Sequence, residues 1–268
     1  MRTSESTKAV TPRPGTAAVR LTARQLVRRF GGVVAVDGVD LSVPPGRITA
    51  VVGPNGAGKS TLFDCLCGTV RPDRGRVLLG GADITRLPEH ARARLGLART
   101  FQQIAVFGSL TVAENVRIGA EAHTGRTLSG LLGLPDPAQE RAREATGRAL
   151  RLLGLEAVRD RPAGGLPTGT LRMVELARAL AGAPRVLLLD EPAAGLDAAE
   201  TARLTAVLRT LSADGMALLV VEHDIDLVAE RADTVYAMAA GRVVACGPTP
   251  VVLADPAVAA LWGEAWST

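Results

Sequence analysis

Two segments near the start of the chain alternate apolar and polar residues, a pattern typical of half-buried β-strands. They run from Val19 to Arg29 and from Val33 to Val43, with a break at Gly31-Gly32 and a stop at the Pro-Pro-Gly of residues 44–46. Glycine and proline at these points favour turns over continued strands. The pattern therefore predicts a small antiparallel sheet at the start of the folded domain.

Three later apolar runs are short and continuous, as in strands that are buried on both faces. The first, RITAVVG at residues 47–53, is stopped by glycine, and the others span Arg185–Asp190 and Met216–Glu222. A helical stretch, Ala198–Ser212, separates the last two and makes a βαβ unit. We therefore expect a largely parallel core sheet, with a further strand and turn at residues 78–81.

The composition between about residues 95 and 181 is helical, rich in Ala, Arg, Leu and Glu, and is interrupted by a Gly/Pro-rich stretch from Gly125 to Pro137. This predicts a helical subdomain inserted into an α/β core. A hairpin is expected around Tyr236–Cys246, with its turn at Gly241 and a final helical stretch ending near Trp266.

The first 18 residues contain Pro, Thr and Ser but no apolar segment of the kind found in signal peptides. They are typical of a flexible tail, which leaves residues 19–268 as the folded domain. Apolar runs such as Ala217–Val221 are far too short to span a bilayer. We expect a cytoplasmic protein which, if it works at a membrane, works from outside the lipid.

The net charge of +4 raises the question of nucleic-acid binding. The arginines are scattered through helical stretches with little aromatic interleaving, which favours a solvated basic surface and no nucleic acid. Lysine usage is more informative: among 31 basic residues only Lys8 and Lys59 are lysines, and Lys8 lies in the expected tail.

Lys59 belongs to the segment from Gly53 to Ser60, which satisfies the phosphate-loop pattern GxxxxGK[ST] between a predicted strand and helix. Glycines let backbone N–H groups approach phosphate oxygens, and the helix N-terminus adds a positive dipole. Lys59 supplies a point charge, and Ser60 offers a hydroxyl to Mg²⁺ beside the phosphates of ATP. The candidate nucleotide-binding residues here are Gly53, Pro54, Asn55, Gly56, Ala57, Gly58, Lys59, Ser60 and Thr61.

A second candidate centre lies where the strand Val186–Asp190 delivers Asp190 and Glu191 at its carboxyl end. Ligands of parallel sheets bind at that edge. Asp190 is expected to bind nucleotide and to orient Mg²⁺ through water. Glu191 is expected to polarise the attacking water as a general base.

From about Val19 to Gly263, the order of further motifs resembles the ABC ATPase family. Arg99–Gln102 is similar to the family's Q-loop, whose glutamine touches magnesium and the attacking water. Residues 194–197 resemble the D-loop, which ends in Asp197 at the dimer contact. His223 matches the switch histidine that contacts the γ-phosphate, and Phe30 resembles the aromatic residue that stacks on adenine.

Each of these four residues also has a purely structural interpretation. Phe30 could belong to the core, Gln102 could be a surface amide, Asp197 could cap the following helix, and His223 could be a buried histidine with its hydrogen bonds satisfied. Their order along the chain favours the family roles. The resemblance implies a P-loop NTPase core with a mainly parallel sheet, an N-terminal antiparallel β subdomain and an inserted helical subdomain.

The signature segment departs from the family pattern, because Leu166-Pro167-Thr168-Gly169-Thr170 stands where LSGGQ is expected. Pro167 removes a hydroxyl and a backbone donor, and Thr168 places a β-branched side chain where glycine allows close approach. In the family, one subunit's signature closes on the nucleotide of the other. The departure therefore predicts a heterodimer of two ABC ATPases with one strong and one weak hydrolytic site.

Three longer runs resemble one of the two ATPases of branched-chain amino acid importers: residues 97–116, the insert at 122–155 and the tail at 247–265. The resemblance implies two permease chains, a second ATPase subunit and, indirectly, an external solute-binding protein. It also implies a peripheral place on the inner face of the cell membrane. The open alternatives within transport are an exporter ATPase and a nucleotide-binding regulator with weakened catalysis. An ABC ATPase that acts on DNA or ribosomes would need coiled-coil arms or a second phosphate loop, and the sequence has neither.

Overall fold

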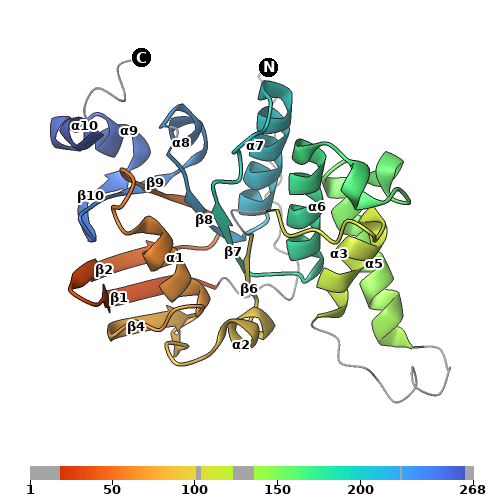
Figure 1. Ribbon diagram of the computed structural model, residues 1–268, viewed down its shortest axis with the longest axis horizontal. Helices are drawn as coiled ribbons and strands as arrows, with labels where there is room; N and C mark the ends of the chain where they lie inside the picture. The colour runs from red at the N-terminus through yellow and green to blue at the C-terminus, as the bar shows by residue number, and fades with distance from the viewer. Residues whose placement is uncertain (1–18, 101–103, 123–135, 224, 263–268) are drawn as a thin grey trace, which may run out of the picture.

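The computed structural model describes residues 19–100, 104–122, 136–223 and 225–262, with side chains up to residue 260. Within these residues, two sheets pack around α1 (Lys59–Cys67), and a group of helices lies to one side of the larger sheet (Figure 1). The expected tail, residues 1–18, lies outside the described residues.

The smaller sheet is antiparallel and has the strand order β2-β1-β4-β5. Its strands are β1 (Leu21–Phe30), β2 (Val33–Val43), β4 (Arg74–Leu79) and β5 (Ala82–Asp83). The alternating segments of the sequence thus form the predicted N-terminal sheet. Buried side chains alternate with more exposed ones at the start of β1 and the end of β2, and register shifts along β1, the first between Ala23 and Leu26, interrupt the period of two.

The larger sheet has the order β10-β9-β3-β8-β7-β6, and only the β10–β9 pair is antiparallel. Its strands are β3 (Ile48–Val52), β6 (Leu97–Arg99), β7 (Val186–Asp190), β8 (Ala217–Val221), β9 (Thr234–Ala239) and β10 (Arg242–Pro248). The three apolar runs form β3, β7 and β8, whose residues are all buried. The predicted parallel core is confirmed.

Register in this sheet brings the carboxyl ends of three strands to one edge. Val221 of β8 lies beside both Val51 of β3 and Asp190 of β7. The loops that follow β3, β7 and β8 therefore start from the same edge of the sheet, where parallel sheets bind their ligands.

Helices cover both faces of the larger sheet. Leu188 of β7 packs with α1 on one face, while Leu187 and Leu189 pack against the helical group on the other. The remaining helices around the sheets are α2 (Glu89–Arg94), α7 (Ala198–Ala213), α8 (Ile225–Arg231), α9 (Thr249–Leu253) and α10 (Pro256–Trp262). This two-sided burial requires continuous apolar strands, as the sequence pattern indicated.

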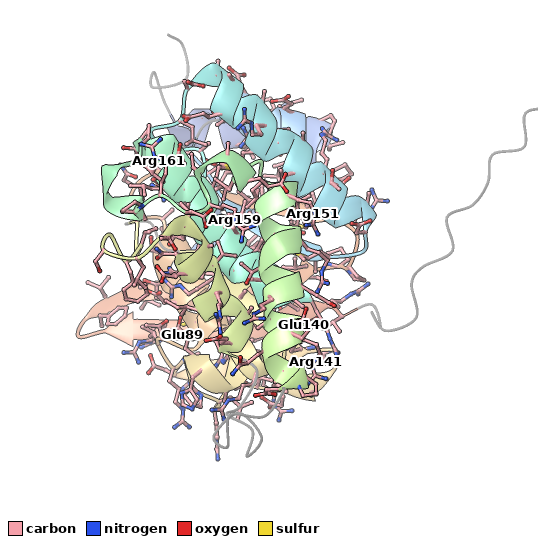
Figure 2. The ribbon with its side chains drawn as sticks, turned by 90° about the vertical axis from the view of Figure 1, so that its right-hand side faces the viewer. Glu89, Glu140, Arg141, Arg151, Arg159 and Arg161 are labelled. Atoms are coloured by element: carbon pink, nitrogen blue, oxygen red, sulfur yellow. The ribbon has the colours of Figure 1, made fainter. Side chains whose placement is uncertain are left out.

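The helical group consists of α3 (Val112–Glu121), α5 (Pro137–Leu152) and α6 (Thr168–Ala181), with two short 3₁₀ turns, η1 (Glu156–Val158) and η2 (Ala163–Gly165). Buried side chains of all three helices share one cluster. Figure 2 shows α5 crossing in front of this group, with Glu140, Arg141 and Arg151 along it. Its outward side carries ion pairs within the helix, such as Arg148–Glu144 at 3.5 Å.

The range from 95 to 181, expected to be helical, also contains a core strand. Residues 97–99 form β6, which pairs with β7 at the end of the larger sheet. A strand of three residues is too short to show a period. The sequence Leu-Ala-Arg has no strong preference for a strand and takes its structure from pairing with the buried β7. Among the described helices, none is both long enough and apolar enough to cross a membrane.

Candidate active site

The phosphate loop connects β3 to α1, and two of its glycines admit no other residue. Gly53 has φ 157° and Gly58 has φ 98°, both in the region that side chains rarely adopt. A Cβ on Gly53 would lie 2.3 Å from the carbonyl oxygen of Met238, and one on Gly58 would lie 2.2 Å from that of Ala35. The close approach of β9 and β2 therefore fixes the shape of the loop.

Lys59 opens α1 with only 8% of its surface exposed. Its Nζ donates to the carbonyl oxygens of Gly53 at 2.6 Å and Pro54 at 3.1 Å. Burial lowers the pKa of Lys59, while the nearby Glu191 and Asp190 carboxylates oppose that shift. The ammonium thus lies inside the loop, with two carboxylates close enough to act on its charge.

The two carboxylates occupy the predicted position at the end of β7. Burial and the neighbouring Glu191 raise the pKa of Asp190, which is 8% exposed, while Arg99 and Lys59 lower it. Glu191 has φ 47°, an unusual value for a residue with a side chain, and its N–H donates to the carbonyl of Val221 at 2.9 Å. Strain of this kind persists where surrounding structure holds a side chain in place.

His223 follows β8 and meets Glu191 across the sheet edge. Its Nδ1 lies 3.6 Å from Glu191 Oε1, and the histidine side chain is mostly exposed. The structural alternative of a buried histidine therefore does not hold. The structure brings together Lys59, Asp190, Glu191 and His223, four candidate residues that come from three separate strand ends.

Glu222, next to His223, was missed by the sequence reasoning. It is 2% exposed, and burial raises its pKa to about 7, against the opposing effect of a hydrogen bond from Ala193 N–H and of Arg231. Its Oε1 has no hydrogen-bond partner among the described residues. An acidic residue directly after a run of six apolar ones was the available signal.

The residues at this edge fit Mg²⁺. That ion takes oxygen donors and commonly uses one or two protein ligands together with phosphate oxygens and water. Asp190 supplies a carboxylate, and Ser60, exposed in the first turn of α1, supplies a hydroxyl. No group of three or more His, Cys, Asp or Glu side chains that could hold a metal ion by themselves occurs among the described residues.

Phe30 ends β1 with 47% of its surface exposed, so it does not belong to the core. The guanidinium of Arg28 lies 4.5 Å from the centroid of its ring. Gln102 falls outside the described residues. Of the remaining loop residues, Asn55 and Gly56 are exposed, Pro54 and Thr61 are half-buried, and Ala57 is buried.

The signature segment and Asp197 form a second cluster. Leu166 is buried, Pro167 occupies the N-cap position of α6, and the helix runs from Thr168 to Ala181. Asp197 caps α7, since its Oδ1 accepts from Glu200 N–H at 2.8 Å. The capping role and a dimer contact are compatible, because a cap uses one side of the carboxylate. Thr170 is half-buried in the first turn of α6.

Comparison with known proteins agrees with this geometry. The family model described as "ABC transporter" matches residues 36–194. The branched-chain amino acid transport ATP-binding protein BraF of Pseudomonas aeruginosa is 37% identical over 90% of this chain and 96% of its own length. The lipopolysaccharide export ATP-binding protein LptB of Acidithiobacillus ferridurans is also 37% identical, over 89% of this chain and 94% of its own length.

Solved structures give the same result. The ADP-bound form of an ATP-binding cassette from an ABC transporter superposes with a TM-score of 0.80 at 33% identity, covering 92% of this chain and 99% of that one. Half of the present chain or more matches the family model, and its relatives match along nearly their whole length. The chain therefore belongs to the ABC transporter family, as one of its ATP-hydrolysing subunits.

Proposed function

We propose that this chain powers the import of branched-chain amino acids or related small polar solutes through membrane permease subunits. The proposal rests mainly on one observation: four side chains suited to ATP hydrolysis lie together at one edge of the sheet. They are Lys59, Asp190, Glu191 and His223. The substrate class rests on the similarity to BraF and on the sequence runs around residues 95–155.

In this proposal, each side chain has a separate task. Lys59 and the backbone N–H groups of the loop bind the phosphates, and Phe30 stacks on the base. Mg²⁺, held by Ser60, Asp190 and Gln102, supplies positive charge next to the phosphates when bound. Glu191 accepts the proton of the attacking water, and His223, 3.6 Å away, orients it and contacts the terminal phosphate.

The altered signature supports a heterodimer with a second ABC ATPase. The Lys59 site of this chain would be closed by the partner's signature, whereas the partner's nucleotide would meet Pro167 and Thr168. The first turn of α6 has no side-chain cap bond and no acidic residue, and Pro167 brings no N–H donor. The site served by this chain's signature is therefore expected to hydrolyse slowly.

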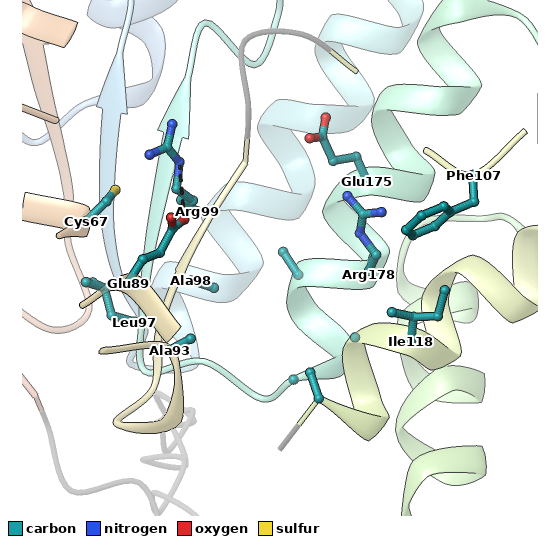
Figure 3. A pocket seen from close by; sticks show the side chains of 14 residues that line it. Cys67, Glu89, Ala93, Leu97, Ala98, Arg99, Phe107, Ile118, Glu175 and Arg178 are labelled. Carbon is teal, nitrogen blue, oxygen red and sulfur yellow. Dashed lines mark ion pairs between the residues drawn. The ribbon is translucent and has the colours of Figure 1, made fainter. Parts of the chain in front are cut away.

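A groove between the core and the helical group is suited to the permease (Figure 3). It has a volume of about 370 Å³ and lies between the α2–β6 segment and the helices α3 and α6. Its lining is mostly apolar, with Phe107 and Ile118 exposed on one wall. Arg99, on the other wall, is the first residue of the Q-loop segment, which in this proposal passes motion to the permease.

Arg178 gives the groove a cation that an acidic residue of a permease helix would meet, beside the Glu175 carboxylate that already acts on it. The guanidinium of Arg178 lies 5.8 Å from the ring centroid of Phe107, and burial lowers its pKa. A carboxylate from a permease would find this cation already partly desolvated. In this proposal the chain meets the permease at the cytoplasmic face of the membrane.

Uptake measurements test the proposal. Cells that lack this chain should take up labelled leucine, isoleucine or valine only when the native chain is restored, and not with Lys59→Ala. The LptB similarity favours an exporter as the second candidate. Restored export of a lipid in place of amino-acid uptake would replace the first proposal with the second.

The groove has its own test. Phe107→Ala together with Ile118→Ser should remove permease subunits from the purified complex while leaving ATP binding intact. Val251→Ser is the matched control, because Val251 is an exposed apolar residue on α9, outside the groove. Equal permease recovery with both variants would place the interface elsewhere.

A further inference from the structure

The first turn of α6 carries the altered signature and has no cap of its own. Pro167 at the N-cap makes no side-chain hydrogen bond to it, and the turn contains no acidic residue. A helix N-terminus with neither feature leaves its backbone N–H groups and its positive dipole end without a local anion.

The neighbouring helix α7 starts in the opposite way, with a complete capping box. Glu200 N–H donates to Asp197 Oδ1 at 2.8 Å, and Asp197 N–H donates to Glu200 Oε2 at 3.1 Å. The side chain of Glu200 is therefore folded back over the start of its own helix, and its conformation is fixed.

The same carboxylate also reaches the signature turn. A Cβ on Gly169 would lie 1.9 Å from Glu200 Oε1 and 2.2 Å from Oε2, so the carboxylate occupies the place of a side chain at that position. The two segments also approach each other nearby, since a Cβ placed on Gly195 would lie 4.0 Å from Thr168 Cγ2. The loop before α7 and the first turn of α6 therefore pack together.

Close packing gives Gly169 a reason to be glycine that is independent of nucleotide. Pro167 and Thr168 depart from the family pattern, but any side chain at residue 169 would have to displace Glu200. The carboxylate also brings negative charge to the uncapped start of α6.

We propose that Glu200 is a positioning residue that fixes the signature turn of this chain to the Asp197 loop. The two segments through which the chain would meet its partner's nucleotide then move as one unit. This inference rests on the proposed pairing with a second ATPase subunit. It assigns the effect of Glu200 to one of the two nucleotide sites, the one that contains this chain's signature.

Site-selective turnover in the assembled transporter tests the inference. Changing this chain's Glu191→Gln leaves only the partner's site active, and the equivalent change in the partner leaves only the Lys59 site. Adding Glu200→Ala should lower turnover about tenfold at the partner's site, which this chain's signature closes. At the Lys59 site the same change should lower turnover by less than about twofold. Glu200→Gln should retain turnover, because glutamine also completes a capping box.

Glu114→Ala is the matched control, because Glu114 closes the equivalent capping box of α3. Thr111 N–H donates to Glu114 Oε2 at 2.7 Å, and Glu114 N–H donates to Thr111 Oγ1 at 3.2 Å. Both variants lose one cap, but only Glu200→Ala also loses the contact with the signature. Equal losses with both variants, or equal losses at both sites, would overturn the inference.

A measurement on the isolated chain keeps this question separate from the pairing. The amide of Leu171 bonds to the carbonyl of Pro167 at 3.0 Å and reports on the signature turn. Glu200→Ala should speed its hydrogen exchange by at least about tenfold, and Glu114→Ala should not. An unchanged exchange rate overturns the positioning role of Glu200. A faster exchange rate in a chain that forms no complex with a second ATPase subunit keeps that role and overturns only the proposed heterodimer.

Discussion

His223 Nδ1 lies 3.6 Å from Glu191 Oε1, although 32 positions separate the two residues in the sequence. The contact follows from the sheet register, which sets Asp190 beside Val221, so that Glu191, one residue later, and His223, two residues later, start from the same edge. The left-handed φ of Glu191 turns its side chain out of the strand direction. The candidate base is thus held by backbone geometry.

Glu191→Gln tests the role of that carboxylate. The amide keeps the size of the side chain but cannot accept a proton, so hydrolysis at saturating ATP should fall by about 10²-fold or more. ATP affinity should change little, because the phosphate loop is untouched. Steady-state ATPase and equilibrium nucleotide binding measure the two quantities.

Glu156→Gln, an exposed residue of η1, is the control for that variant. Unchanged turnover in Glu191→Gln would exclude Glu191 as the base.

Lys59→Ala should weaken ATP binding itself. The side chain is buried in the phosphate loop, and its ammonium is the charge nearest to the expected phosphates. We expect a loss of at least about tenfold in affinity, or about 1.4 kcal/mol, by titration with a fluorescent nucleotide. Lys8→Ala, which changes the only other lysine, should bind as the native chain does; an unaltered affinity in Lys59→Ala would refute the phosphate role.

Arg92 should be a stability determinant, because it is 1% exposed and its guanidinium bonds four backbone carbonyls around the end of α1. These acceptors belong to Cys65, Leu66, Thr85 and Leu87, at 2.7–3.0 Å. Arg92→Ala leaves them buried without that donor and should lower the free energy of unfolding by on the order of 3 kcal/mol.

Denaturant unfolding measures that loss. Arg94→Ala, on the exposed side of the same helix, should change the free energy of unfolding by less than about 0.5 kcal/mol. Similar values for the two variants would contradict the anchoring role of Arg92.

Glu222 should make stability depend on pH. Its folded pKa, about 7, lies above its ordinary value of 4.5, so the folded chain keeps a proton that the unfolded chain releases between these values. The stability that this bound proton contributes is complete below the ordinary pKa of 4.5 and is lost as the pH rises through the folded pKa of about 7. Between them, stability should fall by on the order of 1 kcal/mol per pH unit.

Glu222→Gln cannot lose that proton, so its free energy of unfolding should lack this part of the slope. The variant should be more stable than the native chain above about pH 7 and similar to it near pH 4. Urea unfolding across this range provides the comparison, and identical slopes in the two proteins would show that burial of Glu222 has no such effect.

Sequence patterns predicted those parts of the fold that depend on local periodicity. The runs that became β3, β7 and β8 are continuous and apolar because both faces of the sheet are covered, so they could be recognised one at a time. The phosphate loop was equally accessible, since its glycines serve backbone conformations that a linear motif records.

Contacts between distant segments could not be predicted in this way. The strand β6 exists because β7 pairs with it, and the role of Arg92 depends on carbonyls that lie 26 and 27 positions earlier. Glu200 likewise looks like an ordinary helix-start residue until the fold places Gly169 against it. No pattern along the chain records these distances.

The most direct test of the account is the ATPase rate of the purified chain, with its own signature and with Pro167→Ser and Thr168→Gly introduced together. When the chain pairs with itself, both nucleotide sites use the altered signature, so the native rate should be weak and the rebuilt rate at least about tenfold higher. A native chain that already hydrolyses ATP as fast as the rebuilt one would contradict the predicted asymmetry. Hydrolysis absent from both forms, and from mixtures with the second ATPase subunit, would point instead to a nucleotide-binding regulator.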